Sequence, residues 1–494
     1  MGSGAASLTV ETPRHIAIVG GGFSGTLVAV NLARLSPVPL RVTLINAGSP
    51  AGRGIAYGTR RAEHLLNVAA RNMSALPDHP NHFLAWLRTR TEFADMPETE
   101  LREMFVPRRI FGDYVCNLAL HTLGESAGRT PVATEQIDDE AVAVEPEAAR
   151  ARVHLRAGKP IVADKVVLAT GNESPAEILG SDALGGNPAW CPNPWIDWTG
   201  QMPPPTVPIV LLGTGLTAVD AIVTLLALDW RGQIVAVSRH GLLPEAHFKG
   251  MDYQEFPPPG TDLATLGLDA LVRLMERHCA RLRELGANPG IAVDKLRPHT
   301  QRIWQSFSSQ ERHEFVARHA ARWNVVRHRI APSIHARVAA ALADGRVRVK
   351  AAGVERVEAV GGRIRVHLHD RGGAAAFEEG GLVINGTGPH TRFSATRSRL
   401  LRQLLAAGWA EPDEMDMGVR VGPDYALIGR GGAPSKILYA IGPLLRGTLW
   451  ESIAVPELRV QALNIAQTLL VASATNSGAT PVPWGTADVI EYAI

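Results

Sequence analysis

The chain has 494 residues, which is too long for one hydrophobic core and, at roughly 150 residues per domain, predicts two or three domains. Apolar residues make up 46% of it and charged residues 20%, and its 48 glycines are typical of an α/β protein with many tight turns, so the composition excludes a disordered chain. The formal net charge of +2 gives no reason to expect a nucleic-acid partner.

The three cysteines, Cys116, Cys191 and Cys279, form no Cys-x-x-Cys pair, which argues against a zinc site and against the dithiol of a disulfide reductase. They allow one disulfide at most, which favours a reducing compartment. The first fourteen residues lack a basic start and an apolar core, so no secretory signal is predicted and the protein is expected to be cytoplasmic. The longest apolar stretch, residues 209–228, is interrupted by polar residues and glycines, and no membrane span is expected.

Two stretches of the chain share one pattern of strand, glycine turn, helix and second strand, at residues 15–46 and 207–239. Between them the sequence predicts helices at about 80–127, a β-meander at about 139–169 and a Pro/Trp/Gly-rich connector at 185–208 that marks a domain boundary. After the second stretch the pattern is mostly helical at 262–343, returns to strands at 346–387 and ends in a helix at about 455–471.

The first glycine turn, IVGGGFSG, has the spacing Gly20-x-Gly22-x-x-Gly25 between a predicted strand and a predicted helix. Gly20 permits the tight turn, Gly22 lets the backbone approach a pyrophosphate, and Gly25 lets the helix pack close to the strand. The N–H groups at the helix start, around Phe23 and Ser24, would bind the phosphates of a dinucleotide. The alternative is a plain strand-to-helix turn.

One position departs from this pattern. An acid that binds the ribose is expected about 20 residues after the turn, at the end of the second strand, and the residue there is Asn46. An asparagine can still hydrogen-bond a ribose hydroxyl, but without charge, so the sequence leaves open whether Asn46 makes this contact.

The second glycine turn, LLGTGLTAVD, has the spacing Gly213-x-Gly215-x-x-Ala218, and dinucleotide folds accept alanine at the third position. Leu216 and Thr217 complete the predicted phosphate site. The second strand ends in Ser238-Arg239 instead of an acid, and an arginine there can hold a 2′-phosphate, which favours NADPH over NADH. The alternative is a surface arginine beside a turn.

Two such sites in one chain predict FAD and NADPH as cofactors, with hydride passing from the nicotinamide to the flavin. The predicted fold class is α/β, with two Rossmann-like, doubly wound, three-layer dinucleotide-binding domains. The FAD domain is predicted at 13–200 and 376–494, and the NAD(P)H domain is inserted at 205–375 with a helical insertion at 262–343.

Nine stretches between residues 15 and 470 together resemble a family of FAD/NAD(P)-binding flavoprotein monooxygenases that includes FAD-dependent urate hydroxylases and nitrosuccinate-forming L-aspartate N-monooxygenases. As a set they are specific to the family but not to one substrate. They are IVGGGFSG, GRGIAYGT, HLLNVAARNMSALPD, VVLATGN, LLGTGLTAVD, LRPHTQRIW, RWNVVRHRIAP, INGTGP and YAIGPLLRGTLWESIAVPELRVQA.

The resemblance implies roles for residues in several of these stretches. Gly54 and three candidate catalytic residues, Asn67, Met73 and Ser74, would lie nearest the flavin ring. The two strand-end crossings between the domains would contain Thr170, Gly171 and Gly388. A C-terminal segment with Gly442, Glu451, Ile453 and Ala454 would close over the flavin, the alternative being ordinary C-terminal packing.

The resemblance also implies an FAD-dependent, NADPH-consuming monooxygenase that uses O₂ and a flavin hydroperoxide to hydroxylate a small polar nitrogen-containing substrate. A urate-type purine and an amino acid such as aspartate both fit, and carbon and nitrogen hydroxylation are not distinguished. A flavin reductase or oxidase that passes electrons to a partner or to O₂ is the alternative, and a non-enzymatic nucleotide-binding module is a third reading. Oligomeric state is not readable from these residues.

A polar or anionic substrate would need cationic partners, since bidentate guanidinium contacts suit carboxylate and urate oxygens. The sequence offers Arg297, His299 and Arg302 before one predicted helix and Arg327 after another. A solvated basic face is the alternative for each of them. His313 and His319 are six residues apart in a helical stretch and do not share a face, so no metal site is expected.

Overall fold

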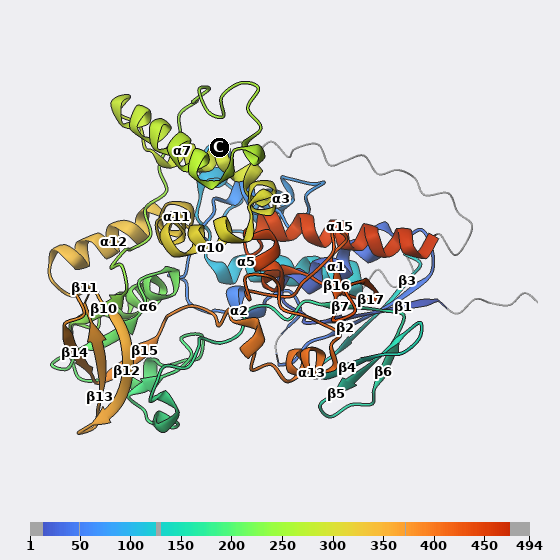
Figure 1. Ribbon diagram of the computed structural model, residues 1–494, viewed down its shortest axis with the longest axis horizontal. Coiled ribbons are helices and arrows are strands. Elements are labelled where there is room, and N and C mark those ends of the chain that lie inside the picture. The colour runs from blue at the N-terminus through green and yellow to red at the C-terminus, as the bar shows by residue number, and fades with distance from the viewer. Residues whose placement is uncertain (1–12, 49, 125–129, 371, 475–494) are drawn as a thin grey trace, which may run out of the picture.

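Two separate sheets, each built around one of the glycine turns, form the two halves of the molecule (Figure 1). The computed structural model describes residues 13–48, 50–124, 130–370 and 372–474. The first twelve residues, for which no secretory signal is predicted, and the last twenty of the predicted FAD domain lie outside these ranges. The predicted α/β class with two Rossmann-like domains is confirmed by these two sheets.

The first sheet has six strands in the order β16-β17-β7-β1-β2-β3. Its central strand β1 pairs in parallel with β2 on one side and β7 on the other, and only β16 is antiparallel to its neighbour. Parallel strands of this kind are covered on both faces, which explains the unbroken run of apolar residues in β1. The strands are β1 Arg14–Val19, β2 Leu40–Ile45, β3 Val132–Ile137, β7 Lys165–Leu168, β16 Ala426–Ile428 and β17 Pro434–Ala440.

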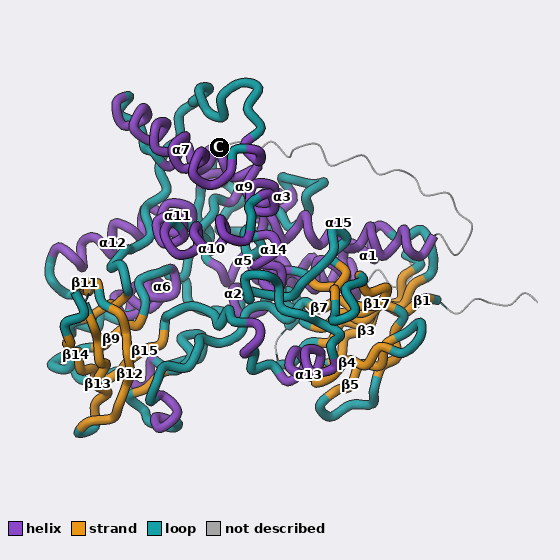
Figure 2. The backbone as a smooth tube through the Cα atoms, in the orientation of Figure 1, coloured by secondary structure: helices purple, strands orange, loops and turns teal. Residues whose placement is uncertain are grey.

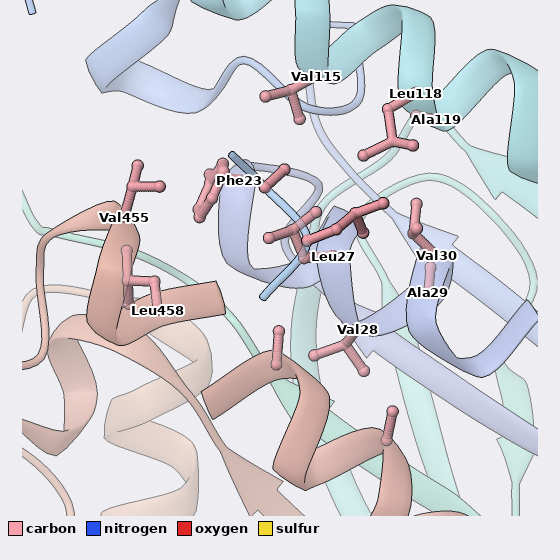
Figure 3. Close-up of a cluster of buried hydrophobic side chains, with 14 of the residues drawn as sticks. Phe23, Leu27, Val28, Ala29, Val30, Val115, Leu118, Ala119, Val455 and Leu458 are labelled. Carbon is pink, nitrogen blue, oxygen red and sulfur yellow. The ribbon is translucent and has the colours of Figure 1, made fainter. Parts of the chain in front are cut away.

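Helix α1 (Phe23–Leu35) is buried between the first sheet and two other helices, α5 (Arg108–Ala119) and α15 (Val455–Ala474). Figure 3 shows the apolar side chains of α1 lying between those of α5 and α15. The opposite face of the sheet is covered by α13 (Arg399–Ala407) and by the predicted β-meander, which is β4 Ala141–Pro146, β5 Ala151–Leu155 and β6 Ile161–Ala163. The first half is therefore a three-layer domain.

The second sheet has five parallel strands in the order β11-β10-β9-β15-β8. They are β8 Trp190–Cys191, β9 Ile209–Leu212, β10 Ile234–Ser238, β11 Val347–Ala351 and β15 Leu382–Asn385. Helices α6 (Leu216–Ala227) and α12 (Pro332–Ala343) share a core with one face. A separate three-stranded sheet packs on the other face of this five-stranded sheet. Its strands are β12 Gly353–Val360, β13 Arg363–His369 and β14 Ala375–Gly380.

Two strands of this sheet lie outside the residues 205–375 predicted for the NAD(P)H domain. Strand β15 pairs with β9 and β8 pairs with β15, so the sheet extends from residue 190 to residue 385. The predicted boundaries at 205 and 375 are therefore too far inward. Strand β8 has only two residues and no readable periodicity, whereas β15 belongs to the predicted run of strands at 346–387, which continues past residue 375.

The predicted helical insertion at 262–343 extends too far, because its last helix, α12, shares the core of the second half, and the part that packs on the first half ends at residue 327. The helices of that part are α7 Gly267–Glu284, α8 Gly290–Leu296, α9 Thr300–Ser306, α10 Ser309–Arg318 and α11 Ala320–Arg327. Figure 2 shows these helices gathered above the two groups of strands. Trp304 of α9 donates a hydrogen bond to the carbonyl oxygen of Gly447 (2.7 Å), and its ring centroid lies 4.9 Å from that of Trp450.

The remaining helices are short and lie in the first half. They are α2 Gly54–Tyr57, α3 His82–Arg88, α4 Glu98–Glu103 and α14 Arg446–Leu449. Within the described ranges, each helix is either too short or too polar to cross a membrane.

Candidate functional site

The first glycine turn has the close packing that the spacing predicts. Gly20 has φ of 109°, and a Cβ on it would overlap the carbonyl oxygen of Ala169 at the end of β7. A Cβ on Gly25 would overlap the carbonyl oxygen of Gly20, so α1 can start this close to β1 only without a side chain there. Gly22 caps α1, and its nearest neighbour is the Cα of Gly54, at 3.5 Å from a Cβ on Gly22. No side chain lies within 4 Å of a Cβ on Gly22 among the described residues, so a pyrophosphate can approach the backbone at the N-terminus of α1.

Asn46 braces this turn. Its side-chain oxygen accepts a hydrogen bond from the backbone N–H of Gly21 at 2.9 Å. This contact gives the residue a structural task that the motif did not reveal, because the motif assigns position 46 to the cofactor alone. A contact with a ribose hydroxyl stays a prediction.

Two buried polar atoms near the first turn lack a partner among the described residues. They are the Thr170 hydroxyl, at the end of β7, and Nε2 of His390. Gly171 and His390 line a cavity of about 40 Å³ together with Pro443 and Arg446. An unpaired buried polar atom costs about 1–3 kcal/mol, so these atoms fit a site whose bound group supplies the missing hydrogen bonds. The glycine turn and these orphaned atoms therefore fit a bound group that supplies hydrogen bonds at the ends of β1 and β7, and FAD at this place stays a prediction.

The C-terminal segment reaches the first glycine turn. Gly442 is buried with φ of 78°, and a Cβ on it would lie 3.3 Å from the Ser24 hydroxyl at the start of α1. Its carbonyl oxygen accepts from the Ser452 hydroxyl (2.6 Å), and its N–H donates to Gln461 (3.2 Å). Ile453 follows with 39% of its side chain exposed. The segment that the resemblance placed over the flavin thus adjoins the turn predicted to bind it.

Two of the three predicted catalytic residues are wrong as cofactor contacts. Met73 is buried in the core of the first half, and Ser74 is fully buried, with its hydroxyl donating to the carbonyl oxygen of His79 (2.7 Å). Both residues directly follow a helical turn at Ala70–Asn72, and the resemblance gave no sign of their burial. Asn67 is half-buried and its carbonyl oxygen lies 2.8 Å from Nε2 of His247, so its role stays a prediction.

The predicted substrate arginines are paired with carboxylates of the protein. Arg297 lies 2.8 Å from Glu457, and Arg327 lies 3.2 Å from Glu451 and 3.4 Å from Glu457. Arg327 and Glu451 are only 7% and 4% exposed, so the alternative of a solvated face is also wrong for this pair. Arg302 forms an exposed ion pair with Asp262.

These pairs correct three predicted roles at once. Arg297 and Arg327 hold the helical insertion on the start of α15 through Glu457, and Glu451 is a partner of Arg327 instead of a cofactor ligand. The Glu451 carboxylate also accepts from the Trp323 ring N–H (3.4 Å). His299 is half-buried, and burial followed by the charge of Arg302 lowers its pKa. The carboxylates are 124 to 160 residues away in sequence, so no local pattern could reveal them.

Acid is expected to destabilise the folded protein through two histidines. Burial lowers the pKa of His328 to about 3 and that of His247 to about 4, from 6.5 for a free histidine. Below pH 6.5 the unfolded chain binds protons that the folded chain refuses, so the free energy of unfolding falls as pH falls, by about 1.4 kcal/mol per pH unit for each histidine. Urea unfolding between pH 7.5 and 5 measures this slope. His328→Asn should make it shallower, whereas His240→Gln at an exposed histidine should not; equal slopes in all three proteins would contradict the assignment.

The second glycine turn repeats the geometry of the first. Gly213 has φ of 111°, and a Cβ on it would overlap the carbonyl oxygen of Gly386 at the end of β15, as one on Gly20 would overlap Ala169. Ala218 packs in the core at 1% exposure, and a Cβ on Gly215 would meet nothing within 4 Å. The N-terminus of α6, with Leu216 and Thr217, is therefore as accessible to a phosphate as that of α1.

Ser238, the last residue of β10, and Arg239, the residue after it, differ in what they contact. The Ser238 hydroxyl lies 2.8 Å from the Thr214 hydroxyl and accepts from the N–H of Gly241 (3.1 Å), so it holds the loops at this strand end together. Arg239 is exposed and has no hydrogen-bond or ion-pair partner in the described part of the chain. Its guanidinium is available to an anionic group.

A cavity of about 720 Å³ lies between the two halves, a volume typical of sites for small molecules and cofactors. Three segments line it: the loop from Gly54 to His64, the connector from Pro194 to Thr199, and one flank of α6 from Thr217 to Thr224. Gly54 was predicted beside the flavin and Thr217 beside NADPH, so one cavity is lined by residues of both predicted sites. Sequence reasoning marked the connector only as a domain boundary and missed its part in this cavity.

The comparisons with known proteins agree with this geometry. Residues 17–173 match the family model described as FAD-NAD(P)-binding. No curated protein matches the chain in sequence.

Three solved structures match nearly the whole fold. The reduced form of ornithine hydroxylase from Pseudomonas aeruginosa has 18% identity and a TM-score of 0.63, over 94% of this chain and 100% of that one. Ornithine N-hydroxylase from Kutzneria sp. 744 has 16% identity and a TM-score of 0.62, over 95% and 100%. L-lysine 6-monooxygenase from Pseudomonas syringae has 16% identity and a TM-score of 0.64, over 93% and 100%. The chain thus matches an FAD-NAD(P)-binding family model at residues 17–173 and has the fold of these three proteins along almost its whole length.

Proposed function

We propose that this protein is an FAD-dependent, NADPH-consuming monooxygenase that hydroxylates a small polar substrate, preferentially at an amine or amino-acid nitrogen. The observation that carries the proposal is the single cavity of about 720 Å³ lined both by the segment next to the first glycine turn and by the flank of α6 next to the second. A cavity shared in this way lets an electron donor and an electron acceptor meet. The choice of nitrogen rests on the names of the fold neighbours, which act on ornithine and lysine.

The residues of the chain would bind, orient and shield. When bound, FAD accepts two electrons from NADPH and makes O₂ reactive towards the substrate. The backbone N–H groups at the starts of α1 and α6 would hold the two pyrophosphates, and the Thr170 hydroxyl would pair with an oxygen of the FAD. The buried segment from Gly442 to Ser452 would keep water away from the flavin. This chemistry requires no protein nucleophile.

Product analysis tests the proposal against a flavin reductase or oxidase. NADPH oxidation, O₂ uptake and H₂O₂ release are measured with and without ornithine, lysine, aspartate and urate. The products of reactions under ¹⁸O₂ are analysed by mass spectrometry. We expect one substrate to stimulate NADPH oxidation, to suppress H₂O₂ release and to gain one ¹⁸O atom. NADPH oxidation that yields H₂O₂ alone with every substrate would overturn the monooxygenase and leave the oxidase.

Arg239 is expected to set the preference for NADPH. An arginine that holds the 2′-phosphate contributes about 1.5–3 kcal/mol, so Arg239→Ala should raise the KM for NADPH by about 10- to 100-fold and leave the KM for NADH nearly unchanged. Steady-state NADPH and NADH oxidation measures both values. The control is Arg231→Ala at the other end of β10, where an exposed arginine pairs with Asp229. Equal losses with NADPH and NADH would mean that Arg239 does not contact the 2′-phosphate.

A further inference from the structure

A buried ion pair joins the two halves of the molecule in the wall of the interdomain cavity. Arg108 of α5, in the first half, contacts Asp220 of α6, in the second, through two hydrogen bonds of 2.6 and 3.1 Å. The two side chains are 9% and 12% exposed. A bidentate pair of this kind fixes the relative orientation of the two side chains as well as their distance, because each of two guanidinium nitrogens must donate to its own carboxylate oxygen.

A second polar contact lies one turn further along α6. The His64 ring lies 2.9 Å from the Thr224 hydroxyl through Nε2 and 2.9 Å from the Thr59 hydroxyl through Nδ1. Asp220 and Thr224 are four residues apart and therefore share one face of the helix. Two anchors on one helix face hold both the position and the rotation of α6.

The first-half residues at this contact are themselves held in place. The N–H of Arg108 donates to the carbonyl oxygen of His64 (2.8 Å), and its Nε donates to that of Leu65 (3.0 Å). Leu65 and Phe105 pack against the hydrophobic core of the second half, next to α6. The polar contacts are therefore backed by apolar packing across the same boundary.

We propose that Arg108 and Asp220 are positioning residues that fix the start of α6, and with it the bound NADPH, relative to the flavin. Reduction of the flavin moves two electrons and one proton from NADPH, which leaves as NADP⁺, and this transfer requires close and aligned donor and acceptor. The pair holds the two halves of the molecule in the orientation in which electron transfer takes place. Electrons therefore pass within the cavity, and neither half rotates against the other. The kinetic part of this inference rests on the proposed function, and the fixed orientation does not.

Three variants test it. Asp220→Asn and Arg108→Gln each remove one charge of the pair, and the double variant removes both and leaves no unpaired buried charge. The matched control is Asp229→Asn, the same substitution just beyond the end of α6, at an aspartate whose ion pair with Arg231 is exposed. If a single variant does not fold, the double variant carries the test.

Amide hydrogen exchange without added NADPH tests the orientation. We expect faster exchange in residues 57–66 and 216–227 in the three pair variants, and no change in the control. Unchanged exchange in all pair variants would overturn the proposal that Arg108 and Asp220 fix the start of α6, whatever the enzyme proves to catalyse.

Anaerobic stopped-flow tests the kinetic part. At saturating NADPH, flavin reduction should slow by about 10- to 100-fold in the pair variants, with flavin content and reduction by dithionite unchanged. The double variant should lose no more than the worse single variant, because the two residues act as a unit. Reduction by NADPH within twofold of the unmodified protein would overturn the positioning role. If NADPH does not reduce the flavin of the unmodified protein, the proposed function fails. The exchange result alone then decides whether Arg108 and Asp220 fix the start of α6.

Discussion

Replacing Gly25 by alanine is expected to yield protein with little bound flavin. A Cβ at Gly25 would overlap the carbonyl oxygen of Gly20, and α1 cannot retreat, because α5 and α15 pack against it (Figure 3). The carbonyl must therefore move, and it belongs to the turn that would hold the pyrophosphate. Overpacking of this kind costs about 1–3 kcal/mol, which would weaken FAD binding by about tenfold or more.

The ratio of flavin absorbance to protein after purification, together with the thermal unfolding midpoint, measures this effect. Gly215→Ala is the matched control in the second turn, where a Cβ would meet nothing within 4 Å. That variant should keep its flavin and its stability while its KM for NADPH rises, since the methyl group would narrow the approach of the phosphates. Full flavin content in Gly25→Ala would show that the first turn does not carry the cofactor.

Removing Arg327 is expected to give the largest loss of stability. Arg327→Met keeps most of the side-chain volume but leaves Glu451 and Glu457 short of a buried cationic partner. Breaking a buried ion pair from one side costs about 3–5 kcal/mol, because the remaining charge stays out of water. The insertion that carries Arg327 should then detach from the start of α15 at lower denaturant concentrations than the rest of the fold.

Urea unfolding followed by tryptophan fluorescence measures this loss, because the ring centroids of Trp304 in the insertion and Trp450 next to Glu451 lie 4.9 Å apart. Arg302→Met is the matched control, since Arg302 pairs with Asp262 on the surface and such pairs contribute about 1 kcal/mol or less. Equal destabilisation by the two substitutions would refute the account of the insertion as held by buried charge.

The two glycine turns could be predicted because each depends on contacts that local sequence encodes. A strand, a glycine turn and a helix follow one another within about 20 residues, and at each turn a short unbroken apolar run gives way to apolar residues with the helical period of 3.6. Gly20, Gly25 and Gly213 accordingly have the tight packing expected of them. The free Arg239 was found in the same way, from its place at the end of β10.

The site residues whose predicted roles are wrong have contacts that the local sequence does not reveal. Arg297 and Arg327 read as available cations because Glu451 and Glu457 come more than 120 residues later. The resemblance implies that Ser74 lies near the flavin ring, but its hydroxyl hydrogen-bonds within a buried turn. Arg108 carried no signal at all, since its significance comes from Asp220, 112 residues away.

The amino-acid pattern alone therefore specified the α/β class, two dinucleotide turns and the order of helices and strands. The tertiary structure alone decided which charges neutralise one another, which polar atoms are left over, and where the two halves enclose a cavity. The physical reason is that backbone conformation is set mainly by neighbours in sequence, whereas burial and ion pairing depend on which distant segments come together. A buried arginine and a free one look the same in a sequence and differ only once the chain has folded.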